Sequence, residues 1–286
     1  MQTKLHAIAD YIRSAHIPVY TISMAEGDGD PLTECITPAN PCQDSYSVAK
    51  AFTTTAIGML WDEGKLHTED KIHALLPEAF AAWKDEIDPR WYDTTVDMAL
   101  THHLGLSGGF LDIDGFDATT FGRDYLHHML TAPLVCAPKA EGIYTDAAFY
   151  LLGRIVTALS GENLTSFLWK RLFYPTGCKE VSWSTCPMGY AMGATGLYIR
   201  SEDMGKLGQV YVSGGTYRGT RIVSPEWIAL CRERGYELHH SGGGWYGKGG
   251  MRGQMLTMHF AKRLTIAWHG YEADCGKILE YIANEV

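Results

Sequence analysis

Apolar residues recur at helical spacing at both ends of the chain. Near the N-terminus they form one face of a helix predicted over residues 3–15: Leu5, Ile8, Ala9 and Ile12. At the C-terminus a second set predicts a closing helix: Ile278, Leu279, Ile282 and Val286. Each helix therefore has one apolar face that must be covered by another layer of the fold.

Strands are predicted next to each of these helices. Residues 18–24 form an apolar segment that ends in the Gly- and Pro-containing turn cluster of residues 27–31. Near the C-terminus, apolar residues alternate with others over residues 256–260 and again over residues 264–268. The short connection at residues 261–263 joins these two runs, so we predict an antiparallel hairpin.

The middle of the chain is predicted to be mostly helical. One apolar face ends at Gly64 and comprises Phe52, Ala56, Met59 and Leu60. Another ends at Gly161 and comprises Phe149, Leu152, Val156 and Leu159. The order of elements predicts an α+β fold, in which an antiparallel sheet is flanked by N- and C-terminal helices and a helical subdomain is inserted.

Charge and composition narrow the classes of partner. The 286 residues carry 33 acidic and 24 basic side chains, a net charge of −9, so we expect no nucleic-acid partner. No apolar run is long enough to cross a bilayer, and the N-terminus lacks the apolar core of a secretory signal. Seven irregularly spaced cysteines fit reduced thiols in a cytoplasmic protein. A small-molecule substrate remains as the expected partner, and the oligomeric state stays open.

The sequence contains no pattern for a metal or a cofactor. It has neither C-x-x-C nor H-E-x-x-H, and the histidine pairs at 102–103, 127–128 and 239–240 lack matching ligands. We therefore expect no metal site and no cofactor.

The first candidate for catalysis is Ser47-Val48-Ala49-Lys50, the single Ser-x-x-Lys in the chain. An offset of three places both side chains on one face of a helix. A serine hydroxyl becomes a useful nucleophile when a neighbour takes its proton, and a lysine can do so in its neutral form. The alternative is a capping serine beside a solvated lysine, because both residue types are common.

Two glycine-rich segments compete with this candidate. Ser107 lies in a G-x-S-x-G pattern, but such an elbow needs a strand before it, and residues 96–100 are predicted to be helical. Residues 242–249 have the spacing of a phosphate loop, but Gly249 stands where the Ser or Thr would be. We interpret the first as a turn and the second as a glycine-rich entry to an edge strand.

Ser47 and Lys50 are part of an ordered set of motifs. Three further motifs follow the first: Thr101–Leu106 in place of T-H-T-S-G-L, Tyr144-Thr145-Asp146 in place of Tyr-x-Asn, and Lys248-Gly249-Gly250 in place of Lys-Thr-Gly. Shorter matching segments lie between them, at residues 64–66, 75–77, 196–198, 201–204 and 224–227. Together they cover residues 40–270. The set resembles the β-lactamase-related serine hydrolases, which include class C β-lactamases, DD-peptidases and family VIII-type esterases.

The resemblance implies a β-lactamase/transpeptidase-like fold and an acyl-enzyme mechanism on a small ester or amide. It implies an α/β subdomain of residues 1–44 and 187–286, a helical subdomain of residues 45–186, and an active site at their interface. By resemblance, Ser47 is the nucleophile, and Lys50 and Tyr144 share the proton transfer. The backbone N–H groups of Ser47 and Met251 form the oxyanion hole. Residues expected to contact the substrate are Asp146, Lys248, Gly249 and Gly250.

Two departures from the family pattern bear on the substrate. Asp146 replaces an asparagine, and an ionised carboxylate cannot donate a hydrogen bond to an amide carbonyl of the substrate. Gly249 replaces a threonine. Both affect amide and β-lactam chemistry more than ester cleavage. They leave open an alternative, a slow-acylating penicillin-binding sensor or a pseudoenzyme on the same scaffold.

Overall fold

The computed structural model describes residues 1–286, which divide into two compact units. Unit 1 comprises Met1–Phe52, Trp169–Ser182 and Thr195–Val286. Unit 2 comprises Thr53–Leu168 and Trp183–Ala194. Neither unit contains a helix with the length and apolar character needed to cross a membrane.

Unit 1 is built on a six-stranded sheet in the order β2-β1-β11-β10-β9-β8, with every neighbouring pair antiparallel. Its strands are β1 (Val19–Glu26), β2 (Leu32–Cys35), β8 (His239–Gly242), β9 (Trp245–Gly249), β10 (Met255–His259) and β11 (Leu264–Gly270). The remaining elements around it are the sheet β3 (Cys42–Asp44), β5 (Leu197–Arg200) and β4 (Val181–Trp183), the ribbon β6 (Thr216–Tyr217) and β7 (Thr220–Arg221), the π-helical turn η4 (Trp169–Phe173), and α10 (Pro225–Arg234).

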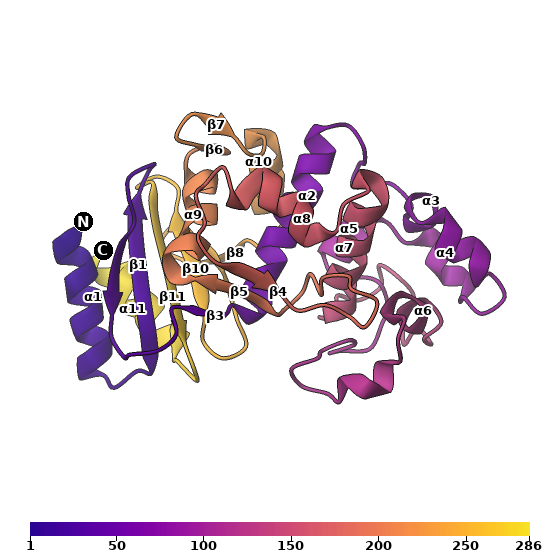
Figure 1. Ribbon diagram of the computed structural model, residues 1–286, viewed down its shortest axis with the longest axis horizontal. Coiled ribbons are helices and arrows are strands. Elements are labelled where there is room, and N and C mark those ends of the chain that lie inside the picture. Colours follow the sequence, from indigo (N-terminus) through magenta and orange to yellow (C-terminus); the bar gives the residue numbers. More distant parts are fainter. The chain divides into compact units, whose positions relative to one another are not determined.

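Helices α1 (Gln2–Ser14) and α11 (Cys275–Glu285) cover one face of the six-stranded sheet. Figure 1 shows both helices beside β1 and β11, with the two chain ends close together. The core on this face comprises Leu5, Ile8, Ala9 and Ile12 of α1, Ile22 and Met24 of β1, Ile266 and Trp268 of β11, and Ile278 and Ile282 of α11. Both terminal helices, the first strand and the 256–268 hairpin are thus confirmed.

Helix α9 (Ser201–Val212) packs on the opposite face, where β11 presents small and polar side chains. A Cβ atom at Gly208 would lie 2.4 Å from Thr265 Cγ2, and one at Gly205 would contact Ala267 Cβ at 3.7 Å. The glycines therefore allow the helix to approach the strand closely. Every residue of β11 is buried, because both faces of the sheet are covered.

His269 is the fully buried polar residue at the end of this strand. Its Nδ1 lies 2.8 Å from Ser201 Oγ, which in turn lies 2.7 Å from Thr21 Oγ1. Burial lowers the pKa of His269 from 6.5 to about 3, because the imidazolium would lose its hydration.

The stability of the protein should fall as the pH drops from about 6.5 toward 3. Over this range the unfolded chain protonates His269 while the folded chain keeps it neutral, which costs about 2 kcal/mol near pH 5. Urea denaturation near pH 7 and near pH 5 measures the loss. His269→Gln should lose less stability between the two pH values, whereas the exposed control His67→Gln should match the wild type. Equal losses in wild type and His269→Gln would contradict the assignment.

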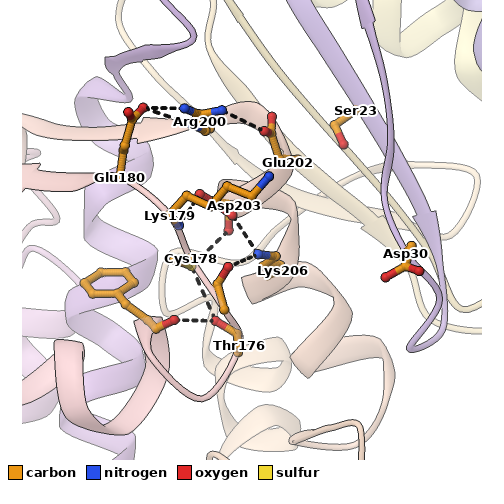
Figure 2. Close-up of polar contacts among 12 residues, drawn as sticks. Ser23, Asp30, Thr176, Cys178, Lys179, Glu180, Arg200, Glu202, Asp203 and Lys206 are labelled. Atoms are coloured by element: carbon orange, nitrogen blue, oxygen red, sulfur yellow. Dashed lines mark hydrogen bonds and ion pairs between the residues drawn. The ribbon is translucent and has the colours of Figure 1, made fainter.

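Within unit 1, hydrogen bonds and ion pairs hold residues 177–180 against the start of α9 (Figure 2). The buried Asp203 carboxylate accepts hydrogen bonds from the backbone N–H of Lys179 at 2.9 Å and from Lys206 Nζ at 2.7 Å. Lys206 also donates to the Gly177 carbonyl at 2.6 Å, and Arg200 pairs with Glu180. The N-terminal turns of α9 therefore hold this segment beside the sheet.

The bounds of the two compact units differ from the expected subdomain limits at residues 44/45 and 186/187, and the subdomain assignment stays a prediction. Residues 45–52 belong to unit 1, where the Ser45 N–H donates to the Leu197 carbonyl at 2.9 Å. Segment 169–182 also belongs to unit 1, and Trp183–Ala194 belongs to unit 2. In the latter, a bridge between Thr185 and Ala191 closes a loop. Such long-range pairings set the limits, and local sequence periodicity does not report them.

Unit 2 is helical, as predicted for the middle of the chain. Its elements are most of α2 (Ala49–Asp62), α3 (Ile72–Leu75), α4 (Pro77–Ala82), η2 (Pro89–Asp93), α5 (Val96–Leu100), η3 (Ala118–Phe121), α6 (Tyr125–Leu130), α7 (Asp146–Ser160) and α8 (Leu164–Leu168). Helix α2 is buried at every residue from Phe52 to Leu60, so its buried surface extends beyond the apolar face that the spacing predicted. Helix α7 begins at the N-cap Thr145 and ends at Gly161, whose φ of 72° is the left-handed conformation that glycine adopts readily.

Candidate active site

Ser47 and Lys50 lie at the start of α2. Ser47 is part of the one-turn 3₁₀ helix η1 (Tyr46–Val48), and α2 continues from Ala49. Lys50 Nζ donates a hydrogen bond to Ser47 Oγ at 3.1 Å. The lysine is fully buried while Ser47 is half-buried, so the hydroxyl is the accessible member of the pair. The structure confirms the close approach that the offset of three predicts.

The backbone before Ser47 is held in an uncommon conformation. Tyr46 has a φ of 46°, in the left-handed region that a bulky side chain rarely adopts. The Asp44 carboxylate accepts a hydrogen bond from the Tyr46 N–H at 2.8 Å, and the Val48 N–H donates to the Ser45 carbonyl. Such strain persists where neighbouring contacts enforce it, and it is concentrated at functional sites.

The turn after β9 passes directly against this segment within unit 1. A Cβ atom at Gly250 would lie 2.7 Å from the Ser45 carbonyl oxygen, so the approach requires glycine. The Gly250 N–H donates to the Gln254 carbonyl at 2.8 Å, and the buried Gln254 side chain donates to the Gly270 carbonyl at 2.7 Å. Gln254, which the sequence analysis gave no role, therefore anchors the turn that carries Met251.

Met251 follows Gly250 in this turn, and its side chain is exposed. Its backbone N–H makes no hydrogen bond within the chain, in contrast to the N–H groups of Gly250 and Gly253. A donor without a partner is what an oxyanion hole requires, since it must be available to the substrate. Its role there remains a prediction.

Lys248 forms a buried ion pair that the sequence analysis missed. Its ammonium contacts the carboxylate of Glu237, and both side chains are almost completely buried. They line a small internal cavity together with Ala51 of α2, which places Lys248 near the first turn of that helix. The sequence does contain a signal for it: Glu237 lies between Tyr236 and Leu238, and an acidic residue inside a short apolar run indicates a buried carboxylate. The pairing neutralises most of the charge that was expected to hold a substrate carboxylate.

Tyr144 and Asp146 belong to unit 2, at the start of α7. The Tyr144 carbonyl accepts a hydrogen bond from the Gly109 N–H at 3.1 Å, and the side chain is 45% exposed. Asp146 is the first residue of α7 and is buried, in a position where the helix dipole favours a carboxylate. An aspartate in place of the family's asparagine at this position therefore also stabilises the N-terminus of α7.

His102 lies beside Tyr144 and also lacked a role in the sequence analysis. Its ring centroid is 4.4 Å from that of Tyr144, with an angle of 36° between the ring planes. Its Nδ1 accepts a hydrogen bond from the Thr145 N–H at 3.3 Å, and the Thr145 hydroxyl donates to the Phe110 carbonyl. Loop 102–110 thus orients the tyrosine from within unit 2.

A comparison with protein families shows which family the chain belongs to. A family model described as Beta-lactamase matches residues 39–269. The chain belongs to the β-lactamase family. The match spans the Ser47–Lys50 pair, Tyr144 and the end of β9.

Some relatives carry the names of hydrolases and others the names of penicillin-binding proteins. A putative D-alanyl-D-alanine carboxypeptidase of Escherichia coli is 24% identical over 255 residues, which cover 71% of this chain and 58% of that protein. The chain spans between 34% and 58% of the length of the first curated relatives that it matches.

Solved structures show the same fold at low sequence identity. A putative 6-aminohexanoate-dimer hydrolase from Bacillus anthracis matches with a TM-score of 0.79 and 16% identity, over 96% of this chain and 80% of that one. A family VIII carboxylesterase matches with a TM-score of 0.74 and 17% identity, over 95% of this chain and 92% of that one. These matches confirm the mixed fold of helices and antiparallel sheet.

The two glycine-rich alternatives do not form the structures that their chemistry needs. Ser107 lies in an exposed loop after helix α5, and no strand leads into it as a nucleophile elbow requires. Residues 242–244 join the edge strand β8 to β9, and β9 continues into a turn and not a helix. In this β-lactamase-family chain, Ser47 is therefore the serine with a lysine at hydrogen-bond distance in a suitable turn.

Proposed function

We propose that this protein is a serine hydrolase that cleaves a small ester or amide through an acyl-enzyme at Ser47. The observation that carries the proposal is the hydrogen bond of 3.1 Å between the buried Lys50 Nζ and Ser47 Oγ. A family match over residues 39–269 supports it, as do relatives named as hydrolases.

In the proposed first step, Ser47 Oγ attacks the substrate carbonyl carbon and its proton passes to Lys50 in the neutral amine form. The carbonyl oxygen becomes an oxyanion, which accepts hydrogen bonds from the backbone N–H groups of Ser47 and Met251. The tetrahedral intermediate collapses, the carbon–oxygen or carbon–nitrogen bond breaks, and the leaving group receives the proton that Lys50 took from Ser47. Water then hydrolyses the acyl-enzyme, and we assign this proton transfer to Lys50 and Tyr144.

The residues around β9 favour an uncharged substrate. Lys248 already pairs with Glu237, so binding a substrate carboxylate would compete with a buried carboxylate that needs the same cation. Gly249 contributes no hydroxyl, and Asp146 contributes no amide N–H. Neutral esters need none of these three contacts, so we propose them as the preferred class.

Intact-protein mass spectrometry tests the proposal with penicillin G and with a short-chain p-nitrophenyl ester. We expect release of p-nitrophenol with multiple turnovers and at most slow formation of a penicillin adduct. A stable adduct on Ser47 with no turnover of the ester would favour the sensor, and no reaction with either reagent would favour the pseudoenzyme. Either result would overturn the proposed hydrolase.

Replacing Tyr144 by phenylalanine should lower kcat for the p-nitrophenyl ester by about tenfold or more, because general acid–base catalysis contributes roughly 10²–10⁴-fold. Steady-state kinetics on the purified variant measures the change. Tyr174→Phe is the matched control, since this tyrosine is 76% exposed, and it should retain wild-type turnover. Unchanged kcat in Tyr144→Phe would remove the phenol from the mechanism.

Replacing Asp146 by asparagine should raise the hydrolysis of nitrocefin by about tenfold relative to the wild type, because the amide can donate a hydrogen bond to the substrate carbonyl. Ester turnover should change much less. Initial rates for both substrates give the ratio. If the nitrocefin rate does not rise, Asp146 is not what limits β-lactam chemistry in this protein.

A further inference from the structure

Unit 2 contains a cavity of about 650 Å³ that the proposed chemistry does not use. Its lining comes from α3, α4, the start of α6 and the C-terminal half of α7, and Tyr190 of the loop 183–194 also lines it. Cavities of this size hold small molecules in other proteins. The apolar part of the lining comprises Leu75, Leu76, Ala79, Trp83, Ala158 and Leu159.

Arg154 supplies the positive charge in this lining, which also contains the carboxylates of Glu78 and Asp124. Its guanidinium makes one hydrogen bond within the chain, to Tyr150 Oη at 3.2 Å, and lies 3.6 Å from the centroid of the Tyr190 ring. A guanidinium carries five N–H donors in a planar fork. Stacking on Tyr190 holds the plane of the fork while most of its donors remain available.

Asp124 is the nearest carboxylate to Arg154, but it serves another role. Its Oδ1 accepts hydrogen bonds from the backbone N–H groups of Leu126 and His127, at 3.0 and 3.2 Å, and so caps α6. The same oxygen is 3.9 Å from Arg154 Nη1, beyond hydrogen-bond distance. The structure therefore leaves the arginine fork without a bidentate carboxylate partner.

We propose that this cavity binds a small monocarboxylate with an apolar body. The carboxylate would accept two parallel hydrogen bonds from Arg154, the geometry that guanidinium groups favour. The apolar body would lie against Trp83 and the leucine and alanine side chains of α3, α4 and α7. None of the residues proposed for the hydrolase chemistry lines this cavity, so the proposal does not rest on the proposed hydrolase activity.

Isothermal titration calorimetry with 4-phenylbutyrate as the probe tests this site. We expect saturable binding to the wild type at one site, and at least about tenfold weaker binding of the neutral 4-phenylbutyramide. Arg154→Met should weaken binding of the carboxylate by about tenfold or more and leave binding of the amide unchanged. Arg123→Met is the matched control, because this exposed arginine of unit 2 is not part of the lining.

A second variant covers the case in which Arg154→Met fails to fold. Ala158 is exposed and lines the cavity, so Ala158→Phe should fill the volume with little effect on the fold. It should abolish binding of 4-phenylbutyrate while turnover of the p-nitrophenyl ester by Ser47 continues. The proposal is overturned if the wild type shows no saturable binding up to about 5 mM probe. It is also overturned if Ala158→Phe binds the probe as the wild type does, which would place the probe elsewhere, for example at Ser47 as a product analogue.

Discussion

Replacing Ser47 by alanine is expected to abolish covalent labelling by a fluorophosphonate probe and by penicillin. Ester turnover should fall by roughly 10³-fold or more, because no other atom in this turn can replace the attacking oxygen. The half-buried serine hydroxyl lies 3.1 Å from the buried Lys50 amine, and no comparable pair forms at Ser107. Intact-mass measurement of the labelled protein, followed by peptide mapping, identifies the modified residue.

Two variants complete this experiment. Lys50→Met keeps the hydroxyl but removes the proton acceptor, so labelling of Ser47 should continue at a much lower rate. Ser107→Ala should label and turn over as the wild type does, since its side chain lies in an exposed loop. Labelling that persists in Ser47→Ala and is lost in Ser107→Ala would reverse the assignment of the nucleophile.

Replacing Glu237 by leucine should lower the free energy of unfolding by about 3–5 kcal/mol. Glu237 and Lys248 are buried together, and removing the carboxylate leaves an ammonium group away from water without its counter-charge. The double variant Glu237→Leu/Lys248→Met should recover most of this loss, because an apolar pair fits the surrounding apolar side chains. Chemical denaturation of the two single variants and the double variant gives the coupling energy.

An exposed ion pair provides the control for this cycle. Lys277 and Asp274 lie 3.4 Å apart with side chains 63% and 50% exposed, so Lys277→Met should change stability by less than about 1 kcal/mol. Equal effects of Glu237→Leu and Lys277→Met would show that Lys248 does not depend on Glu237. The proposed preference for neutral substrates would then lose its support.

Local patterns of residues predicted the serine–lysine pair and several of the helices and strands correctly. The offset of three between Ser47 and Lys50 predicted their proximity, because three residues span nearly one turn of helix. Alternation over residues 256–268 predicted the β10–β11 hairpin, since a strand repeats its side-chain direction every two residues. The terminal helices followed in the same way from the spacing of Leu5, Ile8 and Ile12.

The partners of charged residues could not be predicted in this way. Glu237 precedes Lys248 by eleven residues in a segment with no clear period, and their pairing depends on how the chain reaches β8 and returns along β9. Sequence analysis accordingly gave Lys248 a substrate-binding role and gave Glu237 none. Contacts between segments over twenty residues apart could not be predicted either: the Asp203 carboxylate accepts from the Lys179 N–H, and Lys206 Nζ donates to the Gly177 carbonyl.

The sequence by itself determined the family, because its motifs follow one another in order along residues 40–270. It also determined the terminal helices, the first strand, the C-terminal hairpin and the serine–lysine pair, because each depends on residues within a turn or a strand of one another. Only the tertiary structure decided that Gly250 passes against the Ser45 carbonyl, that Lys248 is neutralised by Glu237, and that Arg154 lines a cavity with most of its donors available. These features arise where distant segments pack together, and the free energy of such contacts depends on burial and geometry that no local pattern of residues records.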